Sequence, residues 1–298
     1  MDEARLGEGR IVRGIGGFYY VEDENGGVHR CRARGVFRKE GTTPLVGDVC
    51  LYSDGGFIEK IKSRKNELRR PRVANLDIVA IVVSAEKPKI DNILCDKLLV
   101  DIKRARIRPL LIINKCDAAD ERSVESIRAE YKNACEVLCV SARTGFGIEA
   151  LKEALSGSCA CFAGQSAAGK SSILNALSPE LRLETGELSR KTGRGTHTTR
   201  EARLIKIEGF PGTLVDTPGF SALEASPLPP EELILYYGDI LPYASGCRFS
   251  GCLHAGEPGC SVKEAVDKNL ISAPRYERYL VILDEIKDLK QKLIYINK

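Results

Sequence analysis

The sequence predicts an α/β chain in three parts: a small β-barrel, a mostly parallel sheet with flanking helices, and a helix-rich C-terminal domain. Short β-prone runs separated by Gly-rich turns fill the first 70 residues. Apolar runs of strand length then alternate with amphipathic helical segments up to residue 164. A Cys/His segment and a long helical segment follow residue 222. We therefore place the domains at 1–70, 71–222 and 223–298.

The N-terminal part reads as about five short strands. Asn25-Gly26 and Asp54-Gly55 are dipeptides that favour hairpin turns, and each stands between β-prone runs, one of which is 28–37. Strands and turns in this arrangement favour an OB-like barrel, and barrels of that type commonly bind nucleic acid.

The excess positive charge of the chain also lies in this part. Residues 1–72 contain 15 Lys/Arg and 11 Asp/Glu, whereas the rest of the chain contains 30 of each. Basic residues are densest in the run KSRKNELRRPR at 62–72. That run predicts either a solvated linker face or a surface that faces a polyanion, because Lys and Arg neutralise phosphates in nucleic-acid binding.

The central part alternates strand and helix patterns. Residues 76–85, LDIVAIVVSA, form a continuous apolar and β-branched run, as expected of a strand covered on both faces. Such alternation indicates a parallel sheet. Further strands are predicted at 109–115, 136–142 and 158–164, and helices at 91–106, 120–133 and 147–155.

A phosphate-binding loop is predicted at 164–172, GQSAAGKSS, which matches G-x-x-x-x-G-K-[ST] between a predicted strand and a predicted helix. Backbone N–H groups would cradle phosphates, the Lys170 ammonium would reach the β/γ oxygens, and the Ser171 hydroxyl would bind Mg²⁺. Ala167 stands where many such loops carry Gly. The nucleotide-binding residues expected here are Gly164, Gln165, Ser166, Ala167, Ala168, Gly169, Lys170, Ser171 and Ser172.

Two further motifs for a nucleoside triphosphate follow this loop. Asp216-Thr217-Pro218-Gly219 ends a β-prone run, so Asp216 can hold Mg²⁺ through water and the Gly219 N–H can reach a γ-phosphate. The Gly- and Thr-rich segment 188–200 fits a mobile loop that senses the γ-phosphate. We predict that Thr199, or alternatively Thr198, binds Mg²⁺.

A guanine-reading motif precedes the phosphate loop. Asn114-Lys115-Cys116-Asp117 ends an apolar strand, and the Asp117 carboxylate can accept the N1–H and N2–H of guanine, donors that adenine lacks. Ser141-Ala142 ends the next predicted strand, where its loop could brace the base. Base reader, brace, phosphate loop, Thr loop and DxxG follow in that order. They predict a circularly permuted P-loop GTPase domain, which a parallel sheet tolerates if the original chain ends lie close together.

The catalytic water has no obvious partner in the DxxG motif. The next residue is Phe220, whereas many GTPases have there the Gln that orients the attacking water. We therefore expect slow intrinsic turnover until a partner or another residue supplies this function. His197 is the candidate within the chain, alongside Lys170 and Thr199 as catalytic residues. Alternatively, His197 only braces its loop or contacts a partner.

A metal site is predicted at 247–260, CRFSGCLHAGEPGC. Cys247, Cys252, His254 and Cys260 supply three thiolates and one imidazole, a set that suits tetrahedral Zn²⁺ and leaves no open coordination position. We expect one structural zinc ion, whose binding folds this short segment. The alternative is a group of cysteines that are simply buried.

Composition is that of a cytoplasmic protein. No apolar run approaches the roughly 20 residues of a membrane span, and the N-terminus is too charged for a signal peptide. The eleven cysteines are scattered apart from the cluster near the C-terminus, which suits a reducing compartment. We expect a monomer.

Taken together, the motifs resemble one family, the circularly permuted GTPases that depend on the small ribosomal subunit (RsgA, also called YjeQ). RGTHTTR at 194–200, DTPGF at 216–220, CRFSGCLHAGEPGC and the permuted order carry the resemblance, which covers nearly the whole chain. It departs from the family at Thr196, where Arg is usual, and at Ala167-Ala168, where Gly-Val is common. The resemblance implies GTP hydrolysis stimulated by the small subunit during its late maturation, and contact with ribosomal RNA.

Other functions stay open at this point. An ATP-using kinase or ATPase is disfavoured by Asp117. A nucleotide-gated RNA-binding module with negligible turnover is conceivable because of Phe220. A permuted GTPase that acts on another ribosomal particle is disfavoured by the combination of barrel and metal site.

Overall fold

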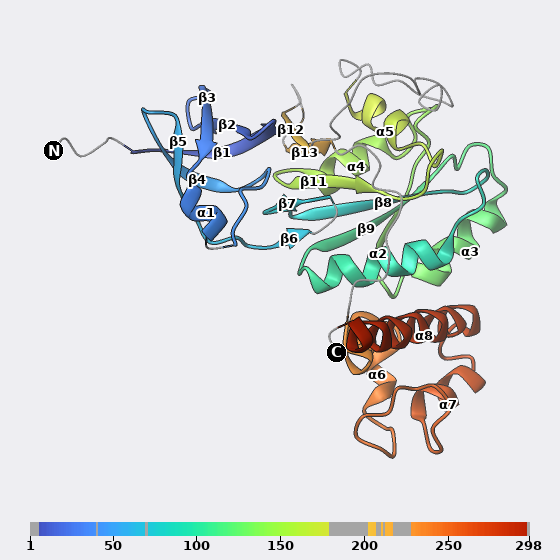
Figure 1. The fold of residues 1–298 in the computed structure, drawn as a ribbon. Coiled ribbons are helices and arrows are strands. Elements are labelled where there is room, and N and C mark those ends of the chain that lie inside the picture. Colours follow the sequence, from blue (N-terminus) through green and yellow to red (C-terminus); the bar gives the residue numbers. More distant parts are fainter. Residues whose placement is uncertain are drawn as a thin grey trace.

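The computed structural model describes residues 6–39, 41–68, 71–178, 202–206, 210, 212–216 and 228–296 (Figure 1). Strand and helix bounds agree closely with the predicted ones in the central part, and the differences lie mainly in the N-terminal part. No helix within the described ranges is long and apolar enough to cross a membrane.

The N-terminal strands close into a five-stranded barrel. The order is β1-β2-β3-β5-β4, and β4 pairs with β1 to complete the circuit. Its core is built from inward-facing residues of these strands together with Phe37. The strands are β1 (Leu6–Ile15), β2 (Phe18–Asp23), β3 (Val28–Ala33), β4 (Val49–Ser53) and β5 (Phe57–Ile61).

One short helix in the barrel corrects the sequence prediction. The expected strand at 28–37 ends at Ala33, and α1 (Gly35–Lys39) follows it. The side chain of Phe37 is buried in the barrel core. Packing of the Phe37 ring in the barrel core therefore favours a helix at 35–39, although the sequence of this run has β propensity.

The central sheet is mostly parallel. Its strand order is β10-β9-β8-β11-β13-β12, and only β12, at the edge next to the barrel, runs antiparallel to its neighbour. The strands are β8 (Ile78–Ser84), β9 (Arg108–Asn114), β10 (Glu136–Cys139), β11 (Cys159–Ala163), β12 (Arg203–Lys206) and β13 (Thr213–Asp216).

Helices cover both faces of this sheet. Alternate residues of β8 divide between two cores: Val79 and Ile81 pack in the core that α2 and α3 cover, and Ile78 and Ala80 pack in the core that α4 and α5 cover. All seven residues of β8 are buried, which explains its unbroken apolar pattern. The helices are α2 (Asn92–Arg104), α3 (Glu121–Tyr131), α4 (Ile148–Leu155) and α5 (Lys170–Leu177).

The barrel and the central sheet are joined. β1 pairs with β12 at Arg13 and Arg203, so the barrel strands continue the sheet. A small hairpin of β6 (Glu67–Leu68) and β7 (Val73–Ala74), which was not predicted, lies in the connection. Val46, which precedes β4, bridges to the β7 side of this hairpin.

The basic run at 62–72 is partly structural rather than a free cationic surface. Arg64 donates two hydrogen bonds to the fully buried carboxylate of Asp48, at 2.8 Å each, and Lys65 pairs with Asp77. Lys62 pairs with Glu8 at 2.5 Å. Part of the charge density of this run therefore holds the barrel and its connection together.

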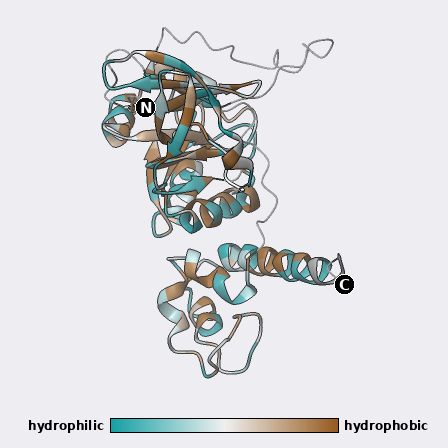
Figure 2. Cartoon of the chain, turned by 60° about the vertical axis from the view of Figure 1, so that its left-hand side comes forward, coloured by the Kyte–Doolittle hydropathy of each residue, from teal (hydrophilic) through white to brown (hydrophobic). Residues whose placement is uncertain are grey.

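The C-terminal part contains η3 (Pro230–Tyr236), α6 (Leu241–Ala244), α7 (Ser261–Asp267) and α8 (Ala273–Ile296). Their shared core also includes Val100 of α2. Tyr279, Leu283 and Ile286 of α8 are buried in this core. Figure 2 shows hydrophobic and hydrophilic residues alternating along α8, as expected of a helix with one buried face.

A buried ion cluster attaches this part to the central domain. Asp96 of α2 accepts from Arg275 at 2.6 Å and from Arg278 at 2.8 Å, and the Asp96 side chain is fully buried. Arg275 also pairs with Asp239, and Arg278 pairs with Glu130 of α3 at 2.6 Å. We call these five residues the α2–α8 ion cluster.

Candidate functional site

The phosphate loop connects β11 to α5 and depends on two glycines. Gly164 has φ +119°, and a Cβ there would lie 2.3 Å from the carbonyl oxygen of Val82. Gly169 has φ +99°, and a Cβ there would lie 2.2 Å from Nδ2 of Asn114. Both positions therefore require glycine, for conformation and for space.

Ala167 adopts the left-handed conformation in this loop, with φ +63°. For a residue with a Cβ this conformation costs roughly 1–2 kcal/mol. Its carbonyl oxygen accepts a hydrogen bond from the Lys115 ammonium at 3.0 Å. The loop thus keeps the conformation that Gly would adopt without strain, and Lys115 of the base motif supports it.

Lys170 lies over the loop that precedes it. Its ammonium donates to the carbonyl oxygens of Gly164 and Gln165, at 2.7 and 2.8 Å. Burial lowers the pKa of Lys170. Ser171 and Ser172 follow in the first turn of α5, where the backbone N–H groups have no partner within the helix. A cation beside a helix N-terminus suits an anionic ligand.

Asn114 links the phosphate loop to the base brace. Its side chain is buried, its Nδ2 donates to Ala168 O at 2.9 Å, and its Oδ1 accepts from Ala142 N at 3.2 Å. Three segments far apart in the sequence therefore meet at the carboxyl ends of β9, β10 and β11. The base motif, the brace and the phosphate loop therefore meet at one edge of the sheet, in spite of the permuted chain order.

Asp117 lies beside this junction with its carboxylate partly covered. The Ser141 hydroxyl hydrogen-bonds to it and the Arg143 guanidinium pairs with it, and these interactions lower the pKa of Asp117. The carboxylate is therefore ionised near neutral pH and can act as a hydrogen-bond acceptor. Ser141 is itself fully buried and is held by Phe146 O through its N–H.

Gln165 has a role that the sequence did not indicate. Its Oε1 accepts from Asp91 N at 3.0 Å, and its Nε2 donates to Lys89 O at 2.9 Å. Its side chain thus ties the phosphate loop to the segment that leads into α2. Arg143 is the other residue that sequence reasoning missed, and its place directly after Ser141-Ala142 was the only available signal.

Part of the predicted site lies outside the described residues. His197, Thr198, Thr199 and Gly219 all fall in ranges that the structure does not describe. Asp216 ends β13, where its backbone pairs with Arg203. Their proposed roles therefore rest on the sequence.

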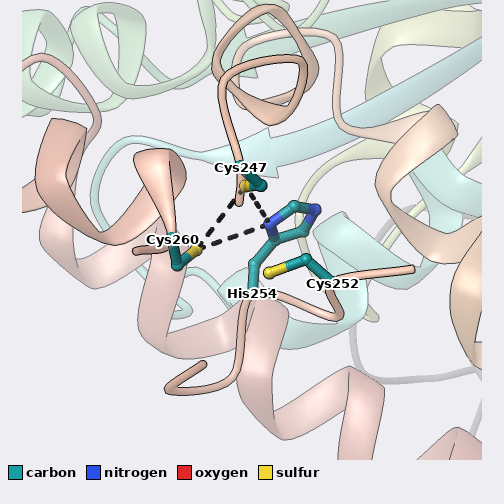
Figure 3. Close-up of side chains that lie close together, drawn as sticks. All are labelled: Cys247, Cys252, His254 and Cys260. Carbon is teal, nitrogen blue, oxygen red and sulfur yellow. Dashed lines mark hydrogen bonds between the residues drawn. The ribbon is translucent and has the colours of Figure 1, made fainter. Parts of the chain in front are cut away.

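The four predicted metal ligands form one cluster (Figure 3). Cys247 Sγ lies 3.5 Å from His254 Nδ1 and 4.0 Å from Cys260 Sγ, and all four ligand atoms lie within 4.8 Å of one another. A tetrahedral zinc ion with Zn–S bonds of about 2.3 Å and a Zn–N bond of about 2.0 Å would separate its ligand atoms by about 3.5–3.8 Å. The donor set and its spacing are compatible with zinc.

Surrounding residues fix the loop that carries this cluster. The hydroxyls of Tyr276 and Tyr279 on α8 donate to His254 O at 2.6 Å and to Leu253 O at 2.9 Å. The Glu257 carboxylate accepts from the N–H groups of Leu253 and Ala255, each at 2.8 Å. Burial alone raises the pKa of Glu257, but backbone hydrogen bonds outweigh it and lower the pKa to about 2.

Comparison with known families identifies similar sequences over nearly the whole chain. The model of the RsgA GTPase family matches residues 61–226, and the model of the RsgA N-terminal domain matches residues 8–55. A protein of Caldanaerobacter subterraneus subsp. tengcongensis named small ribosomal subunit biogenesis GTPase RsgA is 45% identical over 295 residues, which cover 97% of this chain and 99% of that protein. A protein of the same name from Geobacillus sp. (strain WCH70) is 43% identical, with coverage of 96% and 100%.

Solved structures agree with this result. The crystal structure of YjeQ from Thermotoga maritima has a TM-score of 0.81 and 37% identity, and covers 95% of this chain and 99% of that one. The structure of YloQ, described as a circularly permuted GTPase, has a TM-score of 0.77 and 36% identity, with coverage of 97% and 98%. The predicted fold class, a permuted domain between a barrel and a helical C-terminal part, is thereby confirmed.

Proposed function

The chain belongs to the RsgA GTPase family, and from this premise we propose that it hydrolyses GTP to GDP and phosphate during late maturation of the small ribosomal subunit, which stimulates it. The observation that carries the proposal is the junction at Asn114, which joins the phosphate loop to the base brace through Ala168 and Ala142. An ATP-specific enzyme has no need of the adjoining Asp117 carboxylate.

The described residues support a division of labour at the site. Lys170 and the N–H groups of the phosphate loop would stabilise the charge that develops on the transferred phosphoryl group. Asp117 would read the guanine edge and Ala142 would brace the base. Ser171 and Thr199 would hold Mg²⁺, with Asp216 binding it through water and Gly219 near the γ-phosphate. Mg²⁺ held there would supply positive charge that offsets the charge of the phosphates.

Phosphate release with and without purified small subunits tests the proposed activity. We expect slow release by the protein alone and a large increase with small subunits, since Phe220 cannot orient the attacking water. The same assay on His197→Ala tests the proposed catalytic role of His197. If this role is correct, small subunits should no longer stimulate phosphate release by the variant. No release in either condition would favour a nucleotide-gated binding module, and stimulation by large subunits instead would identify another particle.

The barrel offers a surface for ribosomal RNA. The guanidinium groups of Arg30 and Arg32 on β3 lie 3.7 and 4.5 Å from the ring centroid of Phe18 on β2, and both arginines are exposed. Arg13 on β1 lies 6.0 Å from the ring of Tyr20. Exposed cations interleaved with aromatic rings suit contact with phosphates and bases.

Replacing Arg30 and Arg32 together by Ala is expected to weaken binding to small subunits. If each arginine neutralises one phosphate, the slope of log affinity against log salt should fall by about 1.5. Binding measured at several salt concentrations provides the test. Lys132→Ala, which removes an exposed cation at the end of α3, is the matched control, and an equal loss in that variant would contradict a specific barrel surface.

We also propose that Cys247, Cys252, His254 and Cys260 hold one structural zinc ion. Removing it with a strong chelator is expected to release one zinc per chain and to reduce hydrogen-exchange protection of residues 247–260, because metal binding folds so short a segment. Binding of a fluorescent GDP analogue should persist, because all four metal ligands lie in the C-terminal part and none belongs to the proposed nucleotide site. A parallel loss of GDP binding would contradict the separation of the two sites.

We propose that the protein is cytoplasmic and monomeric. None of the eleven cysteines forms a disulfide, and eight of them lie outside the metal cluster. Such usage suits a reducing compartment.

A further inference from the structure

Arg143 occupies the acceptor that the base is expected to use. Nη2 of Arg143 pairs with Oδ2 of Asp117, and this is the ion pair of Arg143 within the described residues. The Asp117 side chain is 14% exposed, whereas that of Arg143 is 77% exposed. The carboxylate is thus covered by a side chain that itself extends mainly into solvent.

A guanidinium group and the guanine edge present the same chemistry to a carboxylate. Both are planar and carry neighbouring N–H donors that suit two-point pairing with carboxylate oxygens. The Ser141 hydroxyl also interacts with this carboxylate. The base edge and the guanidinium therefore compete for Asp117.

Hydrogen bonds hold the backbone of the loop that carries Arg143. Gly145 N donates to Ser141 O at 2.9 Å, and Thr144 N donates to the Ser141 hydroxyl at 3.1 Å. Gly147 follows with φ +73°, and a Cβ there would lie 2.3 Å from Cys139 O. Exposed side chains change rotamer within nanoseconds, so Arg143 can leave and return to Asp117 without displacing the loop.

We propose that Arg143 is a specificity-site residue that acts as an internal competitor of guanine: it pairs with Asp117 when no base is bound and releases it when guanine binds. This inference rests on the proposed function, since it takes Asp117 as the guanine reader. A competitor of this kind lowers the fraction of binding-competent protein and so slows association. It leaves the dissociation rate unchanged, because the bound base has already displaced it.

The test is the binding kinetics of a fluorescent GDP analogue to the full-length protein. An ion pair of ordinary strength near the surface predicts that Arg143→Gln raises the association rate constant by about two- to six-fold. The dissociation rate constant should stay the same. Arg143→Lys keeps the charge but loses the planar group, so a gain there as well would show that the planar pairing, rather than the charge alone, slows association. The gain should shrink at roughly 1 M salt, which screens the ion pair.

The outcomes separate this inference from the function on which it rests. Faster dissociation of the analogue from Arg143→Gln, with association unchanged, would mean that Arg143 clamps the base, and it would overturn the proposal. Unchanged kinetics would overturn it too. Asp117→Asn tests independently whether Asp117 recognises guanine. We expect this variant to lose its preference for guanine over adenine nucleotides. If the preference persists, both the role of Asp117 and the competition by Arg143 are contradicted.

Discussion

Replacing Asp96 by Asn is expected to weaken attachment of the C-terminal part by about 3–5 kcal/mol, the usual cost of removing one partner from a buried ion pair. Arg275 and Arg278 both depend on this carboxylate, and the Arg275 side chain is only 2% exposed. Neutralising it leaves two guanidinium groups buried with less negative charge around them. Hydrogen exchange of α8 and chemical unfolding would measure the loss.

Glu285→Gln is the matched control for this change. Glu285 pairs with Lys97, so the same two helices are bridged, but Glu285 is 41% exposed. A partly exposed pair contributes at most about 1 kcal/mol, so the control should unfold almost as the unchanged protein does. Equal effects of the two substitutions would contradict the importance we assign to the α2–α8 ion cluster.

Replacing Lys170 by Ala is expected to lower the subunit-stimulated turnover number by about 10²–10³, the usual effect of removing one preorganised group that stabilises transition-state charge. The ammonium is held at the phosphate loop by the carbonyls of Gly164 and Gln165, where no other described lysine makes the same contacts. Phosphate release at saturating GTP would measure the effect.

The control for Lys170→Ala is Lys152→Ala on α4, where the ammonium pairs with Glu149 on the helix surface at 2.8 Å. Its turnover should match that of the unchanged protein. Thermal unfolding of both variants would show whether the loop still folds when Lys170 is absent. A folded Lys170→Ala variant that retains full turnover would contradict the proposed role.

Much of the central fold could be predicted because its pattern is local. β8 is buried on both faces and reads as an unbroken apolar run, and α2 and α3 begin where Asp91 and Asp120 cap them through their side chains. α1 was missed because burial of Phe37 in the barrel is a tertiary effect. The boundaries at 70 and 222 stay predictions.

The candidate site divides in the same way. Its motifs were readable because phosphate and base recognition require particular residues at fixed spacings. The side-chain partners of those residues were not. Gln165 reaches Asp91, 74 positions away. The α2–α8 ion cluster, outside the site, gives a second case, because Arg275 reaches Asp96, 179 positions away. Nothing in the pattern of α8 distinguishes Arg275 from a lysine or arginine in solvent, so its burial became visible only in three dimensions.

The permuted strand order has a consequence for a chain that is synthesised from its N-terminus. β8, β9 and β10 pair with one another without any residue beyond Cys139, and α2 and α3 already cover one of their faces. β11 and the phosphate loop are made only afterwards. A nascent chain therefore completes the strands that carry guanine recognition before it has anything with which to hold a phosphate. The hydrogen bond from Asn114 to Ala168 can form only after the phosphate loop has been synthesised. Bound nucleotide can therefore assist the last stage of folding but not the first.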